Sequence, residues 1–438
     1  MNPTIYQKRR KQLLDKIGDG IAVLFSAPEQ RRSNDTQYPY RQDSYLYYLS
    51  GFPEPESVLL LDGKTGRSTL FCREKDPLRE TWDGFRYGPE AAQAVFGVDE
   101  AYPLSEWQSR LSEAIKGSSG LYALWGLYPE YDQELMRLWY PVKQAAVQRA
   151  VTGFVQAPEV LNDLSRILDP MRQIKDASEI DLLRRAGSIS AQAHIRAMRY
   201  TRPGLYEYQV EAELLHHFMQ NGARYAAYNS IVGGGKNACC LHYVDNNNML
   251  QDGDLLLIDA GGEFENYAGD ITRTFPVNGI FSSAQKEVYE IVLAANETAI
   301  QQTLPGAYWK DIQKKALETL VQGLIDLKLL SGSLDENIES QAYRRFYMHG
   351  LGHWIGLDVH DVGGRYHADG SLLPLCPGMC TTIEPGLYIS AAPDIPAEFH
   401  DIGIRIEDNV LITENGNDVY TSEVPKTVAE IEALMQRC

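Results

Sequence analysis

Three of the nine histidines in this 438-residue sequence lie in one short stretch, HGLGHWIGLDVHD at 349–361. His349 and His353 are four residues apart, and in a helix this spacing places both side chains on one face, as in zinc proteases. The glycines in the stretch nevertheless disfavour a regular helix. The stretch alone therefore leaves open whether His349, His353 and His360 share one metal ion or have separate roles.

Four acidic residues lie in segments that are otherwise apolar or β-branched. The segment 253–275 predicts a hairpin, with Asp259 at the end of its first strand and Asp270 within its second. Glu384 and Glu407 lie in two further strand-like segments, CTTIEPGLYI and GIRIEDNVLIT. In the second of these, alternation predicts that Arg405 and Glu407 share one face. If these strands meet in one sheet, four carboxylates converge on one pocket.

Repulsion among these four carboxylates predicts that cations neutralise them. Two like charges 4 Å apart repel by about 4 kcal/mol at an effective dielectric constant near 20, so a bare cluster is unfavourable. Two divalent ions would balance the four charges. Oxygen ligands favour Mn²⁺ or Mg²⁺, and an imidazole ligand extends the range to Co²⁺, Fe²⁺ and Zn²⁺. The alternative is that the four acids are scattered over the surface.

The elements that must position these residues follow two patterns along the chain, which is too long for a single typical core. The first part, to about residue 165, alternates short apolar strands with amphipathic helices at 4–17 and 104–117, which indicates an α/β domain. A linking segment follows at 161–176, with a helix broken near Pro170. Four longer helices are then predicted among strands of a largely antiparallel sheet, at 177–200, 206–222, 284–304 and 309–330. We therefore expect an α/β domain over 1–170 and an α+β domain over 171–438.

Composition excludes several classes of function. The 41 basic and 59 acidic residues give a formal charge of −18, which argues against nucleic-acid binding. No apolar run approaches the roughly 20 residues that span a membrane. The apolar run near the start, IAVLF, is too short for a signal peptide, so we expect a cytoplasmic protein with reduced cysteines. Cys376 and Cys380 lack the second pair that a zinc ribbon requires and are interpreted as structural.

The order and spacing of several motifs resemble those of the pita-bread metallopeptidases and, within that group, of the bacterial Xaa-Pro aminopeptidases (aminopeptidase P). The resemblance covers nearly the whole chain. It implies an N-terminal domain of the ribonuclease H-like, creatinase N-domain type, followed by an α+β pita-bread catalytic domain. The matching segments are 38–57, 80–92, 222–243, 258–279, 349–361, 384–389 and 403–413.

This resemblance implies two metal ions, with Mn²⁺ expected, held by five side chains. Asp259 would hold one ion, and Asp270 and Glu407 would bridge both. His353 and Glu384 would complete the second ion. Of the three clustered histidines, only His353 is then a ligand, and the spacing that it shares with a neighbouring histidine is accidental.

The same resemblance implies roles for other residues. His242 and His360 would contact the scissile carbonyl and the developing oxyanion, and His349 would line the site toward proline. Glu384 would also act catalytically. It would take a proton from the water that becomes the metal-bridging hydroxide and pass this proton to the proline nitrogen. Four further residues would brace the site or contact substrate. In the catalytic domain, Arg405 would brace a carboxylate, and Tyr388 is a weaker candidate for the same role. Trp82 and Asp35 would come from the N-terminal domain of the same chain or of a neighbour.

The activity implied is hydrolysis of the bond between an N-terminal residue and a following proline, in peptides that have proline second. A homo-oligomer, tetramer or dimer, is expected. The alternative is a prolidase, which cleaves only Xaa-Pro dipeptides. Methionine aminopeptidases lack the N-terminal domain, and metal-free hydrolases and binding modules on this fold lack ligands. The loop 363–379 departs from the family pattern, with Cys376 where an acid is expected, so the role of this loop stays open.

Overall fold

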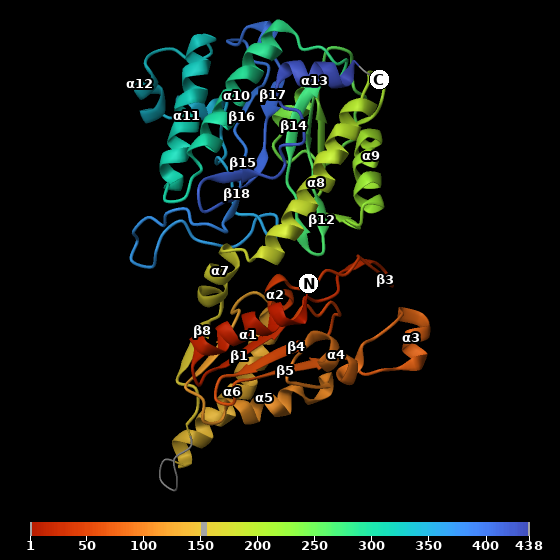
Figure 1. Ribbon diagram of the computed structural model, residues 1–438, viewed down its shortest axis with the longest axis vertical. Coiled ribbons are helices and arrows are strands. Elements are labelled where there is room, and N and C mark those ends of the chain that lie inside the picture. Colours follow the sequence, from red (N-terminus) through yellow and green to blue (C-terminus); the bar gives the residue numbers. More distant parts are fainter. Residues whose placement is uncertain (1, 150–155, 437–438) are drawn as a thin grey trace. The chain divides into compact units, whose positions relative to one another are not determined.

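The computed structural model describes residues 2–149 and 156–436 (Figure 1). The chain divides into two compact units, Met1–Met171 and Arg172–Cys438. The α/β and α+β classes that were predicted for them are confirmed. None of the helices within the described ranges is long and apolar enough to cross a membrane.

The first unit is built on a mixed six-stranded sheet with the strand order β6-β5-β4-β1-β7-β8. Its central strand β1 is the apolar run IAVLF and is buried along its whole length, which explains its place in the middle of the sheet. β1 pairs antiparallel with β4 and parallel with β7. The strands are β1 (Ile21–Phe25), β4 (Val58–Asp62), β5 (Arg67–Cys72), β6 (Glu100–Pro103), β7 (Gly120–Ala123) and β8 (Val160–Asp163), with a separate hairpin of β2 (Arg31–Ser33) and β3 (Thr36–Gln37).

Helices cover this sheet, and one of them is shorter than its sequence pattern predicts. The predicted helix at 104–117 is a 3₁₀ turn, η1 (Leu104–Glu106), followed by α5 (Trp107–Ile115). The remaining helices of the unit are α1 (Pro3–Ile17), α2 (Ser44–Ser50), α3 (Pro77–Asp83), α4 (Gly88–Phe96), α6 (Pro129–Arg149) and α7 (Ser165–Gln173), the last of which continues past the end of the unit.

The prediction of a helix broken near Pro170 is wrong, because α7 continues through this residue. Proline removes one backbone donor, and in a helix that begins only five residues earlier this forfeits a single intrahelical hydrogen bond. The buried side chains of Leu168 and Arg172 on either side of the proline hold the turn in place.

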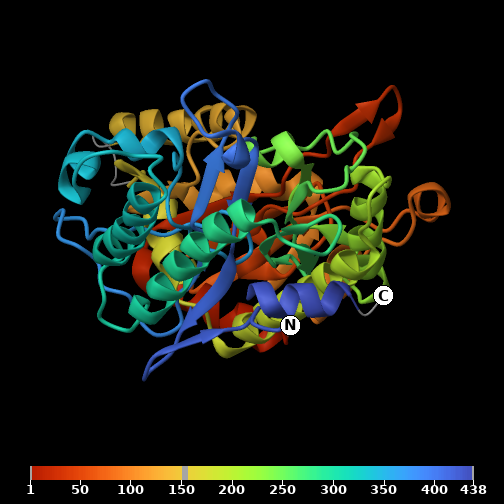
Figure 2. The same ribbon diagram turned by 90° about the horizontal axis from the view of Figure 1, so that it is seen from above.

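The second unit packs long helices against antiparallel strands, and every strand pairing among its described residues is antiparallel. α8 (Ala177–Tyr200) coincides with the predicted helix, and it begins at a capping box of Asp176 and Glu179. It packs on α9 (Glu207–Gln220), and α10 (Ser283–Gln302) packs on α11 (Trp309–Asp326). The C-terminal helix α13 (Val428–Met435) is the blue helix that ends beside the label C in Figure 2.

The strands of the second unit form several small sheets. β11 (Leu255–Asp259) pairs with β10 (Ile231–Gly234) on one side and with β14 (Thr272–Pro276) on the other. The other strands are β9 (Tyr225–Ala226), β12 (Gly262–Phe264), β13 (Tyr267–Ala268), β15 (Cys380–Ile383), β16 (Gly386–Ile389), β17 (Ile402–Arg405), β18 (Asp408–Ile412) and β19 (Asn417–Val419). The short helical elements are η2 (Gly235–Cys239), α12 (Leu334–Glu339), η3 (Ala342–Arg345) and η4 (Ala397–Phe399).

The four acids lie at or near strand ends. The predicted placement of Asp270 within a strand is wrong, and the single sheet that would join the four segments is not formed. Asp270 precedes β14 by two residues instead of lying within the strand. Glu384 lies between β15 and β16, and Glu407 between β17 and β18, which belong to separate sheets. The physical reason is that interior strand positions disfavour acids, whereas a strand end lets the side chain leave the pleat. Only Asp259 is part of a strand, as its last residue.

Candidate metal centre

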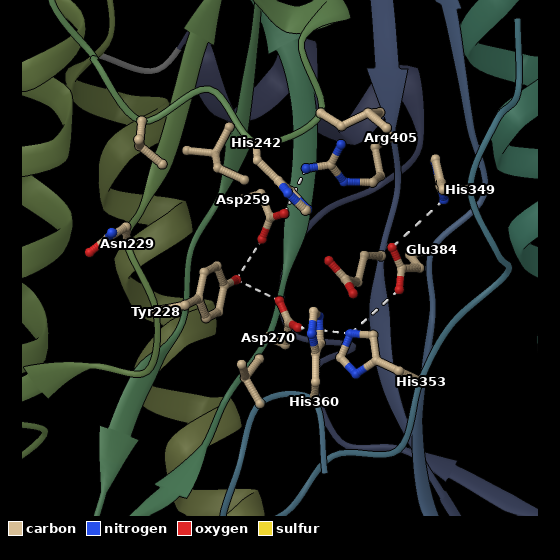
Figure 3. Close-up of a pocket in the computed structure, with 15 residues that line it drawn as sticks. Tyr228, Asn229, His242, Asp259, Asp270, His349, His353, His360, Glu384 and Arg405 are labelled. Atoms are coloured by element: carbon tan, nitrogen blue, oxygen red, sulfur yellow. Dashed lines mark hydrogen bonds and ion pairs between the residues drawn. The ribbon is translucent and has the colours of Figure 1, made fainter. Parts of the chain in front are cut away.

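A pocket of about 400 Å³ in the second unit brings together nine of the side chains that were selected from the sequence (Figure 3). They are Asp259, Asp270, Glu384, Glu407, His242, His349, His353, His360 and Arg405, joined by Tyr228, Asn229, Ile231, Leu241, Val244 and Val359. Tyr388 does not line the pocket but contacts residues that do. Trp82 and Asp35 belong to the first unit, where both are exposed.

Asp259 is held from two sides. Its Oδ2 accepts a hydrogen bond from Arg405 Nη2 at 2.6 Å, and its Oδ1 accepts one from the Tyr228 hydroxyl at 2.5 Å. The same hydroxyl contacts Asp270 Oδ1, so Tyr228 spans the two aspartates. Tyr228 was not selected from the sequence, because one tyrosine in the polar segment 224–230 carries no periodic or motif signal. Only the folded chain brings it between two acids.

Asp270, His353 and Glu407 form the tightest group of ligand-type atoms, each of which lies within 4.8 Å of the others. His353 Nε2 is 3.4 Å from Asp270 Oδ2 and 3.5 Å from Glu384 Oε1. Hydroxyl groups orient the two glutamates: Thr272 Oγ1 donates to Glu407 Oε2, and Thr382 Oγ1 donates to Glu384 Oε1. Four ligand-type side chains therefore face one another across a few ångströms.

Burial of these carboxylates makes their negative charge unfavourable. Burial raises the pKa of Asp270, and the charge of Asp259 adds to this effect. Burial raises the pKa of Glu384 to about 7. The pKa of Glu407 is raised well above its usual value, first by burial and then by the charges of Asp270 and Glu384. The cluster is thus short of positive charge, as the sequence argument requires.

The same carboxylates also raise the pKa of His353, because their negative charge stabilises the protonated ring. Burial alone lowers its pKa, but the hydrogen bond with Asp270 and the charges of Asp270 and Glu384 outweigh burial and raise the pKa to about 9. Its Nδ1 lies 3.0 Å from the Trp354 carbonyl oxygen, so Nδ1–H donates to that carbonyl. This leaves Nε2 directed at the carboxylates, which is the arrangement of a histidine that binds a metal.

The chemistry of these donors fits divalent ions. Four carboxylates and one imidazole nitrogen offer oxygen-rich ligation, which suits Mn²⁺ and Mg²⁺ and also accommodates Co²⁺, Fe²⁺ and Zn²⁺. The raised carboxylate pKa values give the physical test of this fit: the side chains are buried, and His353 and Arg405 offset only part of their negative charge. Either protons or metal ions must offset the rest.

His349 is joined to the cluster by a chain of hydrogen bonds through Tyr388 and Arg405. Arg405 Nη1 donates to the Tyr388 hydroxyl at 2.9 Å, and that hydroxyl donates to His349 Nε2, also at 2.9 Å. His349 Nδ1 donates to the carbonyl of Gly350. Burial and the charge of Arg405 lower the pKa of His349 to about 4, so the ring is neutral. No helix runs through 349–361, so the helical explanation of the histidine spacing is excluded.

His360 lies against His353, with 4.2 Å between their ring centroids. Burial and the charges of His353 and His242 lower its pKa. The segment that carries it is fixed by Asp361, whose buried carboxylate contacts Arg172 at 2.5 Å and Lys175 at 2.9 Å. Together these contacts keep a neutral imidazole beside the group of ligand-type side chains.

Comparison with known proteins supports this interpretation of the pocket. A model described as metallopeptidase family M24 matches residues 181–414, and one described as aminopeptidase P, N-terminal domain, matches residues 6–122. A Xaa-Pro aminopeptidase of Haemophilus influenzae is 46% identical over 433 residues, covering 98% of this chain and 96% of the relative. One of Escherichia coli is 46% identical over 437 residues, covering 98% and 97%. The solved structure of Pseudomonas aeruginosa aminopeptidase PepP is 45% identical, with a TM-score of 0.95 over 100% of this chain and 98% of that one.

Proposed function

The chain belongs to metallopeptidase family M24, and from this premise we propose that it is an Xaa-Pro aminopeptidase with two divalent ions in its pocket. The observation that carries the proposal is the set of five ligand-type side chains lining one pocket in a chain 46% identical to curated Xaa-Pro aminopeptidases. Its substrates are peptides with proline in second position, cleaved after the first residue.

The five ligands divide between the two ions. Asp259 would hold one ion, Asp270 and Glu407 would be ligands of both, and His353 and Glu384 would complete the other. The close approach of Asp270 and Glu407 to His353 supports their place at the second ion. When bound, a pair of ions lowers the pKa of water toward about 7 and acts as a Lewis acid. Mn²⁺ is the ion that we propose.

Glu384 moves the proton in this reaction. Its carboxylate takes a proton from the attacking water and delivers it to the proline nitrogen, which leaves as an amine. The position of Glu384 in the pocket, with Oε1 3.5 Å from His353 Nε2, supports this role, because a group that transfers protons must lie within reach of the reacting atoms. The proline nitrogen carries no N–H before cleavage, so the proton must come from such a group.

The histidines contact the substrate. His242 and His360 donate to the scissile carbonyl oxygen as negative charge develops on it. His349 lines the pocket on the proline side, held by Tyr388. Arg405 braces Asp259 and, through the Tyr388 hydroxyl, His349 as well, so one buried guanidinium orients two parts of the site.

We propose a homo-oligomer, tetramer or dimer, in which the first unit supplies Trp82 and Asp35 to a site. The support is an apolar surface on and after α3: Trp82 is 86% exposed, Leu78 81% and Phe85 66%. Exposed aromatic residues of this kind mark association surfaces. Sedimentation velocity of the wild-type chain and of Trp82→Ala tests this proposal, since the variant is expected to shift toward smaller species.

A prolidase must bind the free carboxylate of a dipeptide, which usually takes an arginine. Arg405 is the one arginine among the described residues that line the pocket, and it is bound to Asp259. Arg365 in the 363–379 loop donates to the Gly352 carbonyl and stacks 3.8 Å from the centre of the Trp309 ring. Both arginines therefore have other partners, which supports an aminopeptidase over a prolidase.

The test is the dependence of kcat/KM on peptide length. An Xaa-Pro dipeptide, its C-terminal amide and the same peptide extended by several residues are compared with Mn²⁺ present. Longer peptides are expected to be cleaved at least as well as the dipeptide, and a chelator should stop the reaction until Mn²⁺ is restored. Cleavage confined to the dipeptide acid would instead identify a prolidase.

A further inference from the structure

Glu207 is a carboxylate at the start of α9 that is completely buried and takes no part in the proposed reaction. Its Oε1 accepts hydrogen bonds from Gly234 N at 2.8 Å and from Asn237 Nδ2 at 3.0 Å. Its Oε2 accepts from the Tyr243 hydroxyl and from Asn248 N, both at 2.8 Å. All four donors lie within residues 234–248.

This segment carries His242 into the pocket. Leu241, His242 and Val244 all line the pocket, and His242 is drawn among its side chains in Figure 3. After η2, residues 240–248 form neither helix nor strand, so no ladder of backbone hydrogen bonds fixes their path. An irregular segment of this kind depends on side chains to satisfy its backbone groups and to define its conformation.

Two buried polar side chains supply that definition. Asn246 has a left-handed backbone conformation, with φ of 46°. Its Oδ1 accepts a hydrogen bond from Val232 N in β10, and its Nδ2 donates one to the carbonyl of Ser230, which precedes β10. Glu207 accepts hydrogen bonds from both ends of the segment, Gly234 and Asn248, and from Tyr243, the residue that directly follows His242. Hydrogen bonds to a charged acceptor are about twice as strong as neutral ones, and the N-terminus of α9 stabilises the negative charge.

We propose that Glu207 is a positioning residue, which fixes residues 234–248 so that His242 meets the scissile carbonyl. Tyr243 transmits this constraint, because its hydroxyl is bound to Glu207 and its backbone adjoins His242. The inference rests on the proposed function, in which His242 contacts substrate. It adds a residue outside the pocket on which the reaction depends.

Glu207→Gln tests the proposal with little change of shape. The amide keeps one acceptor oxygen, but its NH₂ group faces backbone or side-chain donors, so at least one of the four hydrogen bonds is lost. We expect kcat to fall roughly ten- to a hundredfold with metal content unchanged, since a 1 Å displacement of a catalytic group can cost about a hundredfold. Hydrogen–deuterium exchange over 234–248 should become faster.

Glu213→Gln is the matched control. Glu213 lies on the same helix and pairs with Arg196 of α8 at 2.5 Å instead of with the His242 segment. This variant should keep wild-type kcat and wild-type exchange over 234–248. If both variants lose activity equally, or if neither does, Glu207 has no special link to His242 and the proposal is overturned.

A double-mutant cycle separates positioning from general stability. If Glu207 acts through His242, then Glu207→Gln should cause little further loss of kcat in a His242→Ala background. Multiplied losses would overturn the inference. A normal kcat for His242→Ala would instead refute the role of His242 in the proposed function, so the two failures are distinguishable.

Tyr243→Phe keeps the proposal testable if Glu207→Gln does not fold. It deletes one hydroxyl and one of the four hydrogen bonds, and a loss of about two- to tenfold in kcat is expected, again absent in the His242→Ala background. Wild-type kcat and wild-type exchange over 234–248 in Tyr243→Phe would overturn the proposed link between Glu207 and His242.

Discussion

Glu407 and Asp408 are neighbours in the sequence and both are buried, yet their carboxylates behave in opposite ways. Glu407 is 2% exposed and Asp408 0%. Burial and the charge of Asp270 raise the pKa of Glu407 well above its usual value. Burial would also raise the pKa of Asp408, but Arg273 and Lys426 outweigh it and lower the pKa to about 2.

The difference lies in the partners that each side chain meets. Arg273 Nη2 donates to Asp408 Oδ1 at 2.7 Å, and Lys426 Nζ donates to Oδ2 at 2.9 Å. Thr421 adds a neutral hydrogen bond. The Glu407 carboxylate, by contrast, accepts a hydrogen bond from the Thr272 hydroxyl and lies among other carboxylates.

Burial therefore does not decide whether a carboxylate stabilises the fold. Successive residues of an extended chain point to opposite faces, so one short segment supplies both a compensated acid and an uncompensated one. Arg273 Nη1 also donates to the backbone carbonyl of Glu407 at 2.6 Å, which ties the two faces together. Asp408 and Arg273 hold the backbone in place, and the Glu407 carboxylate remains available to bind cations.

Glu407→Ala should have the largest effect on this comparison. A carboxylate that bridges two ions is a ligand to both, so its removal is expected to lower metal content and abolish peptide hydrolysis. The purified variant is analysed for metal by atomic emission and assayed with an Xaa-Pro peptide. Two ions per chain with normal turnover would show that Glu407 is not a ligand.

Asp408→Asn should act on stability instead of chemistry. It leaves the buried Arg273 and the partly buried Lys426 without their counter-charge, and breaking a buried pair in this way costs about 3–5 kcal/mol in the free energy of unfolding. Urea denaturation measures the change. Asp418→Asn is the control, because its partner Arg184 is 48% exposed and such pairs contribute about 1 kcal/mol or less. Equal losses in both variants would contradict the comparison.

Much of this framework could be predicted from the sequence. The helix at 177–200 was placed correctly because its apolar period is long and its start carries a capping box. The acids were selected because charged residues in apolar runs are unusual. Both signals are local: each depends only on residues that are close together in the sequence, so each can be recognised without knowing the fold.

The remaining features depend on contacts between distant segments, which leave no local pattern. Tyr228 reaches Asp259 and Asp270 across 31 and 42 residues. Glu207 at a helix start is, from the sequence, an ordinary exposed acid. The division of the acids among separate sheets could not be foreseen either, because the short linkers at Glu384 and Glu407 resemble continuous strands.

His360→Ala separates groups that hold metal from groups that act on substrate, and its effect should be smaller than that of Glu407→Ala. Loss of one donor to the developing oxyanion typically lowers kcat by about 10²–10³-fold. Both metal ions should remain. His367→Ala, which removes an exposed histidine from the nearby loop, should leave kcat unchanged. Loss of metal from His360→Ala would make His360 a ligand and overturn the division of the three histidines.

The smallest predicted effect is an increase in the free energy of unfolding, whereas most substitutions of buried residues lower it. In the metal-free protein, Glu407→Gln should raise the free energy of unfolding at pH 7.5, because it removes a buried charge that the neighbouring Arg405 offsets only in part. A raised native pKa means that the folded chain binds this proton more tightly than the unfolded chain does. Stability is therefore lost as pH rises above the unfolded value of 4.5, by about 1.4 kcal/mol for each unit between the two pKa values. The advantage of the variant should then shrink as pH falls from 7.5 toward 4.5. Urea denaturation of chelated wild type, Glu407→Gln and Asp408→Asn at several pH values measures it. Destabilisation by Glu407→Gln at pH 7.5, as Asp408→Asn is expected to give, would mean that the two neighbouring carboxylates serve the fold alike.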